Sequence, residues 1–136
     1  MKSRNPFALF SDKKILVVDD SDMNNSVIKA ILERYGVNVL LAQNGVDAVE
    51  QFKQSEPSSI CAILMDIAMP VMDGCEAAKK IRALGRADSK KVPIIAVTAS
   101  VDSCDKDKIM ADGMTDFLAK PINPELLLKT LGAHLE

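Results

Sequence analysis

The sequence lacks any hydrophobic stretch long enough to cross a membrane. Its longest apolar run, residues 60–65, has six residues, and residues 7–10 form only a short run near the N-terminus. A membrane-spanning helix needs roughly 20 apolar residues, and the run at residues 7–10 is also too short for the core of a signal peptide. We therefore expect a soluble, cytoplasmic protein that has no membrane partner.

Cysteine is scarce, and its spacing fits neither a disulfide framework nor a zinc site. The three cysteines are Cys61, Cys75 and Cys104, an odd number with no C-x-x-C pair. Cys61 lies inside an apolar run, where a buried thiol is the simplest interpretation. This cysteine usage indicates a reducing compartment.

A large excess of charge of one sign is also missing. The chain has 17 basic and 19 acidic residues, so its net charge is −2. That balance argues against nonspecific nucleic-acid binding by this chain alone, because such binding depends on positive charge that neutralises phosphates. A hydrophobic content of 48% and a charged content of 26% over 136 residues are typical of one globular domain.

Short apolar runs rich in β-branched residues alternate with longer stretches of helical period. Three of these runs are apolar on both faces, which indicates parallel strands covered by helices on both sides. We therefore predict an α/β fold built from five βα units around a parallel sheet. The predicted strands are residues 14–18, 37–41, 60–65, 92–97 and 115–118, and the predicted helices are residues 23–35, 45–55, 74–84, 102–111 and 124–135.

Side chains suited to phosphate and metal chemistry follow four of these strands. Asp19 and Asp20 end the first strand, Asp66 the third and Thr98 the fourth, and Lys120 follows the fifth. Ligands of open parallel sheets bind beyond the carboxyl ends of the strands, so these side chains are expected to meet there. Three crowded carboxylates favour Mg²⁺, which prefers oxygen ligands, and a carboxylate beside that ion can act as a nucleophile toward phosphorus.

Each of these residues also has an ordinary interpretation. An acidic residue among Asp19, Asp20 and Asp22 could cap the first helix. Asp66 could be a loop carboxylate, and Lys120 a solvated lysine. The joint occurrence of all these groups at successive strand ends is harder to explain in that way.

Four motifs together resemble the receiver domain of two-component response regulators, the CheY-like family. They are Ile-Leu-Val-Val-Asp-Asp at residues 15–20, Met-Asp-Ile-Ala-Met-Pro-Val-Met-Asp-Gly at 65–74, Ala-Val-Thr-Ala at 96–99 and Lys-Pro at 120–121. The resemblance covers residues 13–135 and implies a flavodoxin-like (βα)5 three-layer sandwich with strand order 2-1-3-4-5, an order that the receiver CheY itself exemplifies. We expect the receiver domain at residues 13–136, preceded by a lead-in at residues 1–12 that is native or the edge of a domain cut from a longer protein.

The resemblance also implies roles for the acidic residues. Asp66 would be the phosphoacceptor and a ligand of Mg²⁺. Asp19 and Asp20 would hold the same ion, and the backbone carbonyl of Ala68 would be a further ligand.

The remaining implied roles concern signalling within the domain. Thr98 would be the switch hydroxyl that follows the phosphoryl group, and Lys120 would contact that group and precede a cis bond to Pro121. Phe117 stands where the family places a rotating aromatic residue, although a plain core aromatic is an equally good interpretation.

The implied function is that of a phosphoacceptor signalling domain, not an enzyme with a separate substrate. The donor would be a phosphohistidine on a histidine kinase or histidine phosphotransfer protein. The domain would catalyse its own phosphorylation and dephosphorylation, and a downstream protein would bind to the fourth helix, the fifth strand and the fifth helix. His134, the only histidine, lies near the C-terminus and is not expected to be a donor. The chain could be a stand-alone regulator or the receiver of a hybrid kinase.

Two helices contribute to the predicted partner surfaces. In residues 23–35, Val27, Ile31 and Tyr35 share a face that we predict packs on the sheet. Ile28 and Leu32 lie beyond it and form a candidate docking patch for a kinase or phosphotransfer helix, with extra core packing as the alternative.

The helix at residues 102–111 is polar up to residue 108. Only Ile109, Met110 and Ala111 could anchor it, so we expect it to be among the less stable helices.

Three other functions fit the sequence less well. A phosphatase of the haloacid dehalogenase type needs a second Asp two residues after the nucleophile, where Ala68 stands, and a substrate cap. A flavodoxin would need a phosphate loop rich in hydroxyl groups and glycine after the first strand, where residues 19–22 would repel phosphate. A receiver-shaped module that is never phosphorylated would not need the complete acidic set.

Overall fold

The computed structural model describes residues 10–69, 71–99 and 103–135, without the side chains of residues 103–105. The predicted alternation of strands and helices is confirmed, with boundaries that differ by a few residues and an additional short 3₁₀ turn, η1. The predicted start of the fourth helix, Asp102, lies outside the described residues. The elements are β1 (Lys14–Val18), α2 (Asp22–Glu33), β2 (Asn38–Ala42), α3 (Gly45–Gln54), β3 (Ile60–Asp66), α4 (Gly74–Arg82), η1 (Asp88–Lys90), β4 (Ile94–Thr98), α5 (Ser103–Ala111), β5 (Asp116–Ala119) and α6 (Pro124–Leu135).

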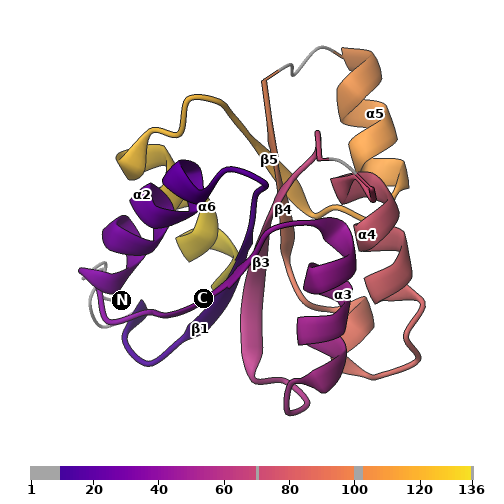
Figure 1. Ribbon diagram of the computed structural model, residues 1–136, viewed down its shortest axis with the longest axis horizontal. Coiled ribbons are helices and arrows are strands. Elements are labelled where there is room, and N and C mark those ends of the chain that lie inside the picture. Colours follow the sequence, from indigo (N-terminus) through magenta and orange to yellow (C-terminus); the bar gives the residue numbers. More distant parts are fainter. Residues whose placement is uncertain (1–9, 70, 100–102, 136) are drawn as a thin grey trace.

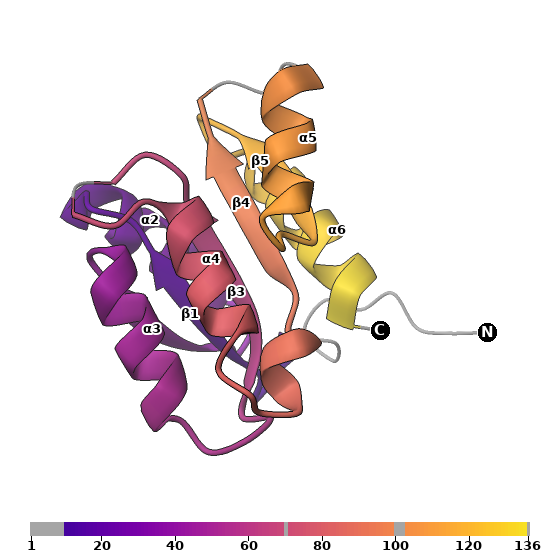
Figure 2. The ribbon, with the colours of Figure 1, turned by 90° about the vertical axis from the view of Figure 1, so that its right-hand side faces the viewer.

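The five strands form one parallel sheet in the order β2-β1-β3-β4-β5, as the resemblance implied. Helices α2 and α6 cover one face, and α3, α4 and α5 cover the other (Figures 1 and 2). In the register, Val18 pairs with Met65 and Asp66 pairs with Val97. The carboxyl ends of β1, β3 and β4 therefore meet at the same edge of the sheet.

Each face of the sheet has its own apolar core. In β3, Ile63 and Met65 pack toward α3 and α4, while Ala62 and Leu64 pack toward α2 and α6. This alternation of buried residues on both faces explains the continuous apolar runs in the sequence. Large, fully buried side chains contribute on both sides, among them Phe52, Ile81, Ile94, Phe10, Ile15, Leu32 and Leu127.

The predicted core face of α2 is partly wrong. Ile28 and Leu32, the candidate docking patch, are only 4% and 0% exposed, whereas Val27 is 53% exposed. The buried stripe of this helix is Asn25, Ile28 and Leu32, which follow one another at the helical spacing of three and four residues. Extra core packing, the alternative interpretation of Ile28 and Leu32, is therefore correct.

Helix α5 has fewer buried apolar residues than the three predicted anchors. Of its three predicted anchors only Ile109 is buried, while Met110 and Ala111 are exposed. Asp112, just after the helix, binds Lys108 at 2.7 Å and Lys79 of α4 at 3.2 Å.

The Cys75 thiol of α4 donates a hydrogen bond to the Asp112 carboxylate. Burial, and after it the hydrogen bond to Asp112, together raise the pKa of Cys75 to about 11. A thiol with so high a pKa stays protonated at neutral pH, so Cys75 is a structural donor and not a reactive nucleophile.

At least one residue of the predicted lead-in belongs to the core. Phe10 is 1% exposed, packs in the core beneath α2 and α6, and stacks at a tilt on Tyr35 with ring centroids 6.4 Å apart. Residues 1–9 lie outside the described residues, so the boundary predicted at residue 12 remains a prediction. Among the described helices, none is both long and apolar enough to cross a bilayer.

Candidate functional site

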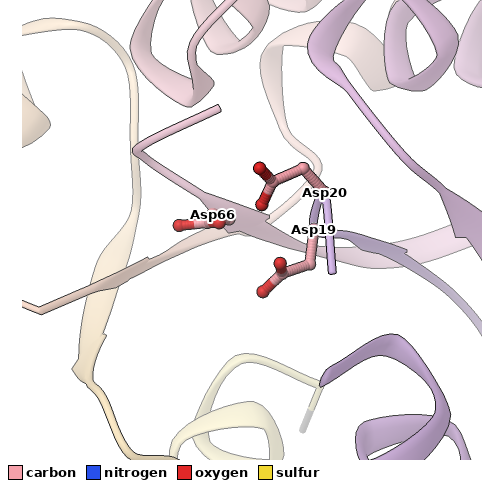
Figure 3. Close-up of side chains that lie close together, drawn as sticks. All are labelled: Asp19, Asp20 and Asp66. Carbon is pink, nitrogen blue, oxygen red and sulfur yellow. The ribbon is translucent and has the colours of Figure 1, made fainter. Parts of the chain in front are cut away.

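Asp19, Asp20 and Asp66 converge at the carboxyl edge of the sheet. One carboxylate oxygen of each lies within 4.8 Å of the corresponding atoms of the other two. Figure 3 shows the three side chains pointing into the same space from the ends of β1 and β3. Asp19 and Asp66 are only 3% and 2% exposed, whereas Asp20 is exposed to solvent. The sequence-predicted acidic cluster is thus present.

Lys120 reaches the same cluster from the loop after β5. Its Nζ lies 3.2 Å from Asp66 Oδ1 and 3.6 Å from Asp19 Oδ2. The backbone N–H of Lys120 donates to the Thr98 carbonyl at 2.8 Å, which places Thr98 at the end of β4 beside this loop. The bond between Lys120 and Pro121 is cis, as the resemblance implied.

The charges of the site are unevenly balanced. Burial raises the pKa of the Asp66 carboxyl and the charge of Asp19 raises it further, while contacts with Lys120 and the Ala68 N–H oppose the shift. Burial lowers the pKa of Lys120, but its hydrogen bonds and charge interactions with Asp66 and Asp19 outweigh burial and raise it overall. The single ammonium group of Lys120 thus contacts two buried carboxylates, those of Asp19 and Asp66, and the Asp20 carboxylate lies close by. Added positive charge would stabilise the ionised form of all three.

The two oxygens of Asp66 differ in their surroundings. Oδ1 accepts from the Ala68 N–H at 3.3 Å and contacts Lys120. Oδ2 is buried and has no hydrogen-bond partner among the described residues. A buried carboxylate oxygen without a partner is costly. The donor set of three carboxylates and this unpaired oxygen fit an oxygen-seeking dication such as Mg²⁺.

Asp19 is fixed by polar residues that the sequence analysis did not identify. Its carboxylate accepts from the Ser21 N–H at 2.9 Å and from Asn24 Nδ2 at 3.3 Å. Asn25 Nδ2 donates to the Asp19 carbonyl at 3.0 Å. Ser21, not an aspartate, caps α2, because its hydroxyl accepts from the Asn24 N–H at 3.2 Å. Helix capping therefore does not account for Asp19 or Asp20.

Gly74 closes the loop that follows Asp66. Its N–H donates to the Ile67 carbonyl at 3.0 Å. A Cβ atom at this position would collide with the backbone carbonyl of Asp66. The glycine in the motif at residues 65–74 is therefore required by the close approach of two backbone segments.

Phe117 of β5 lies on the face of the sheet that α5 covers. Its ring is partly buried and packs against the core on the α3, α4 and α5 side. The Nζ of Lys106 lies 5.1 Å from the ring centroid, a cation–π arrangement that joins β5 to α5. This partial burial is compatible with both interpretations of Phe117, the rotating and the structural one.

A groove of about 440 Å³ opens beside the cluster, between α2 and the loop that leads into α6. Asp19 and Lys120 line its end next to the carboxylates, so the groove is continuous with the acidic site. Its other walls are largely apolar. They are formed by Met23, Asn24, Val27, Ile28, Val97, Pro121 and Ile122.

Comparison with known proteins agrees with this geometry. The family model of the response regulator receiver domain matches residues 15–132. The chain is also 38% identical over 125 residues to hybrid signal transduction histidine kinase I of Dictyostelium discoideum. That match covers 90% of this chain but only 7% of the much longer kinase.

Two solved structures share the fold closely. The receiver domain of the sensor histidine kinase PA1611 from Pseudomonas aeruginosa, solved with magnesium in its active-site cleft, is 36% identical with a TM-score of 0.81; the match covers 92% of this chain and 98% of that one. A chain in the complex of the Saccharomyces cerevisiae phosphotransfer protein Ypd1 with the Ssk1 receiver domain is 33% identical with a TM-score of 0.83, and the match covers 93% and 90%. This chain belongs to the family of response regulator receiver domains.

Proposed function

We propose that Asp66 is the phosphoacceptor of this receiver domain and that Mg²⁺ assists the transfer. The observation that supports this most directly is the position of the Asp66 carboxylate. It is buried between Asp19 and Lys120, and one of its oxygens lacks a partner among the described residues. Such a carboxylate is held in place, and the cation beside it can receive the charge of a phosphoryl group.

The proposed reaction transfers a phosphoryl group from a phosphohistidine. A carboxylate oxygen of Asp66 attacks the phosphorus in line, and a P–O bond forms as the P–N bond breaks. The electron pair of the P–N bond returns to the imidazole nitrogen of the donor. Lys120 stabilises the oxygens of the transferred group, and the Thr98 hydroxyl would donate to one of them. Hydrolysis of the resulting acyl phosphate at the same site would restore Asp66.

Asp19, Asp20 and Asp66, together with the backbone carbonyl of Ala68, are the ligands that we propose for Mg²⁺. When bound, this ion offsets the negative charge that the carboxylates and the phosphoryl oxygens bring together. The magnesium found in the PA1611 receiver domain supports this proposal.

Asp20→Ala tests the metal site. Asp20 is exposed, so its loss should leave folding nearly unchanged, while removal of one anionic ligand should weaken Mg²⁺ binding about tenfold. Isothermal titration of wild-type and variant protein with MgCl₂ measures the difference. Asp107→Ala is the matched control, because Asp107 is exposed on α5. Asp47 is less suitable, because it lies in the first turn of α3. Equal affinities for Asp20→Ala and wild type would exclude Asp20 as a ligand.

We place the phosphoryl donor over the groove beside the acidic site. Met23 and Val27 are 76% and 53% exposed on α2, one helical turn apart, and the groove that they line ends at Asp19 and Lys120. An apolar helix face of a histidine phosphotransfer protein or kinase would cover them and bring its phosphohistidine to Asp66. The complex of Ypd1 with the Ssk1 receiver supports a partner of this class.

Val27→Glu should separate protein donors from small ones. A carboxylate buried in the docking surface should slow transfer from a phosphorylated histidine phosphotransfer protein about tenfold, while phosphorylation by acetyl phosphate should stay unchanged. Val46→Glu is the matched control, because Val46 is 44% exposed but lies on α3, on the opposite face. If both substitutions slow transfer from the protein donor equally, α2 is not the docking helix.

The output surface that we propose comprises α5, β5 and α6. Phosphorylation would draw Thr98 toward the phosphoryl group, and Phe117 would follow, which shifts a two-state equilibrium on this face. The contact of Lys106 with the Phe117 ring supports a link between β5 and α5. The Nε2 atom of His134 in α6 lies 3.0 Å from Asp116 Oδ2 of β5. We do not propose His134 as a phosphoryl donor.

The proposed receiver domain covers residues 13–136, and Phe10, which precedes it, packs in its core. The free thiols of Cys61 and Cys75 fit a reducing environment, so the cytoplasm is the compartment that we propose. The small part of the Dictyostelium kinase that matches is compatible with a receiver inside a hybrid kinase as well as with a stand-alone regulator.

A further inference from the structure

Asn25 is a polar residue in the buried stripe of α2. Its side chain is 2% exposed and lies on the same face as Ile28 and Leu32. Its Nδ2 group donates to the Asp19 carbonyl at 3.0 Å and to the Ala42 carbonyl at 3.3 Å. Its Oδ1 atom is buried and has no hydrogen-bond partner within the described parts of the chain.

Packing alone does not explain an amide at this position. A buried acceptor without a partner is destabilising, and a half-satisfied polar group is less favourable than an apolar group of the same shape. Leucine has nearly the same shape as asparagine and would suit neighbours such as Ile28. What asparagine provides at this position, and leucine would not, is therefore the pair of donated hydrogen bonds.

Those hydrogen bonds control one particular peptide unit. The Asp19 carbonyl belongs to the peptide bond that joins Asp19 to Asp20. The Asp19 N–H donates to the Ala42 carbonyl at 3.1 Å, so Asn25 and Ala42 hold the backbone of Asp19 from both sides. Because a peptide unit is planar, fixing its carbonyl also fixes the direction in which the chain continues to the Asp20 Cα.

Asp19 and Asp20 differ in how much they need this support. The Asp19 carboxylate has its own contacts with Ser21, Asn24 and Lys120. The Asp20 carboxylate is exposed and makes no hydrogen bond or ion pair in the described residues, although it reaches the carboxylate cluster. The position of Asp20 therefore depends on its backbone.

We infer that Asn25 is a positioning residue for the dication site: by holding the Asp19–Asp20 peptide against the end of β2, it directs the Asp20 carboxylate toward Asp66. This inference rests on the proposed Mg²⁺-dependent function and assigns that function a residue outside the ligand set. Asn25 touches neither the ion nor the phosphoryl group. Its effect is on the affinity for the ion and not on the chemistry of Asp66.

Two substitutions separate this role from a purely structural one. Asn25→Ala removes the donors and leaves a gap, whereas Asn25→Leu removes the donors and the unpaired acceptor but keeps the shape. Both variants are expected to bind Mg²⁺ about tenfold more weakly than wild type, the usual size of an effect on residues that orient metal ligands. The Asp20 backbone amide signal in NMR spectra recorded without Mg²⁺ should shift in both variants. At saturating Mg²⁺, phosphorylation by acetyl phosphate should recover toward the wild-type rate.

Ser26→Ala, a change at an exposed position next to Asn25 on the same helix, is the matched control and should bind Mg²⁺ normally. Urea unfolding without Mg²⁺ measures the stability of each variant. If Mg²⁺ affinity falls only in a variant that has lost stability, or in neither, the positioning role of Asn25 is wrong. If the wild-type protein itself binds no Mg²⁺, the proposed dication site is wrong, and this inference falls with it.

Discussion

Asp66→Asn is expected to abolish the incorporation of acid-labile phosphate from acetyl phosphate or from a phosphorylated histidine donor. The amide lacks the negative charge and the nucleophilic oxygen that form an acyl phosphate. The substitution conserves the shape of a side chain that is 2% exposed, so the fold should persist. Burial, and after it the charge of Asp19, raise the pKa of Asp66, so the neutral asparagine also removes the cost of a buried charge and the repulsion from Asp19.

Radiolabelled phosphate or a mass shift of the intact protein measures the loss. Asp107→Asn is the matched control, because it makes the same change of charge at an exposed position of α5. The control should be labelled like wild type, and peptide mapping of labelled wild-type protein should place the phosphoryl group on Asp66. Undiminished labelling of Asp66→Asn would mean that another residue is the acceptor.

The sequence was sufficient to predict the alternating architecture and the position of the acidic cluster. Both rest on the same property, because β3 is apolar on both faces and must lie inside a parallel sheet. Once the sheet is parallel, the residues that follow β1, β3, β4 and β5 meet at one edge regardless of loop details. That is why Asp19, Asp66 and Lys120 could be brought together before any distance was known.

The core face of α2 could not be predicted in the same way. The helix has apolar residues at two registers, Val27–Ile31 and Ile28–Leu32, and periodicity alone fits both. The stripe that is buried continues to Asn25, a polar residue, so it looked less apolar than the stripe that is exposed in part. The polar residue Asn25 thus made the helix face that packs on the sheet look less apolar than it would with a hydrophobic residue at that position.

The contacts of long side chains also could not be predicted from the sequence. Arg82 is one of 17 basic residues, and nothing in its neighbourhood in the sequence indicates that it is partly buried. Its partners lie between seven and 33 positions away along the chain. Only the folded chain shows which basic residue meets several carbonyl groups at once.

Arg82→Met is expected to lower the free energy of unfolding by about 3 kcal/mol, because several partly buried acceptors lose a charged donor. The guanidinium donates to the carbonyls of Gly113 at 2.9 Å, Val92 at 2.7 Å and Ser89 at 3.2 Å, and to Thr115 Oγ1 at 3.2 Å. These acceptors come from the turn after α5, the residues before β4 and the residue just before β5. One side chain thus joins α4 to the segments that lead toward Thr98 and Phe117.

The stability loss should come from the hydrogen bonds and not from lost packing, since methionine keeps most of the aliphatic length. Burial lowers the pKa of Arg82, yet an arginine remains charged at any ordinary pH. Arg82→Lys should restore little, because one compact ammonium group cannot reach three chain segments together. Gly113, whose φ is +100° and whose added Cβ would lie 3.0 Å from Arg82 Cγ, shows how closely the side chain follows this backbone.

Urea unfolding followed by circular dichroism at 222 nm measures the effect, with Arg34→Met as the matched control. Arg34 is exposed at the end of α2, and its loss should change stability by no more than about 0.5 kcal/mol. If Arg82→Met is as stable as Arg34→Met, the carbonyls of Val92 and Gly113 are satisfied without the guanidinium. If it is destabilised but still phosphorylated on Asp66, then α4 stabilises the start of β5 without taking part in the chemistry at the opposite end of the sheet.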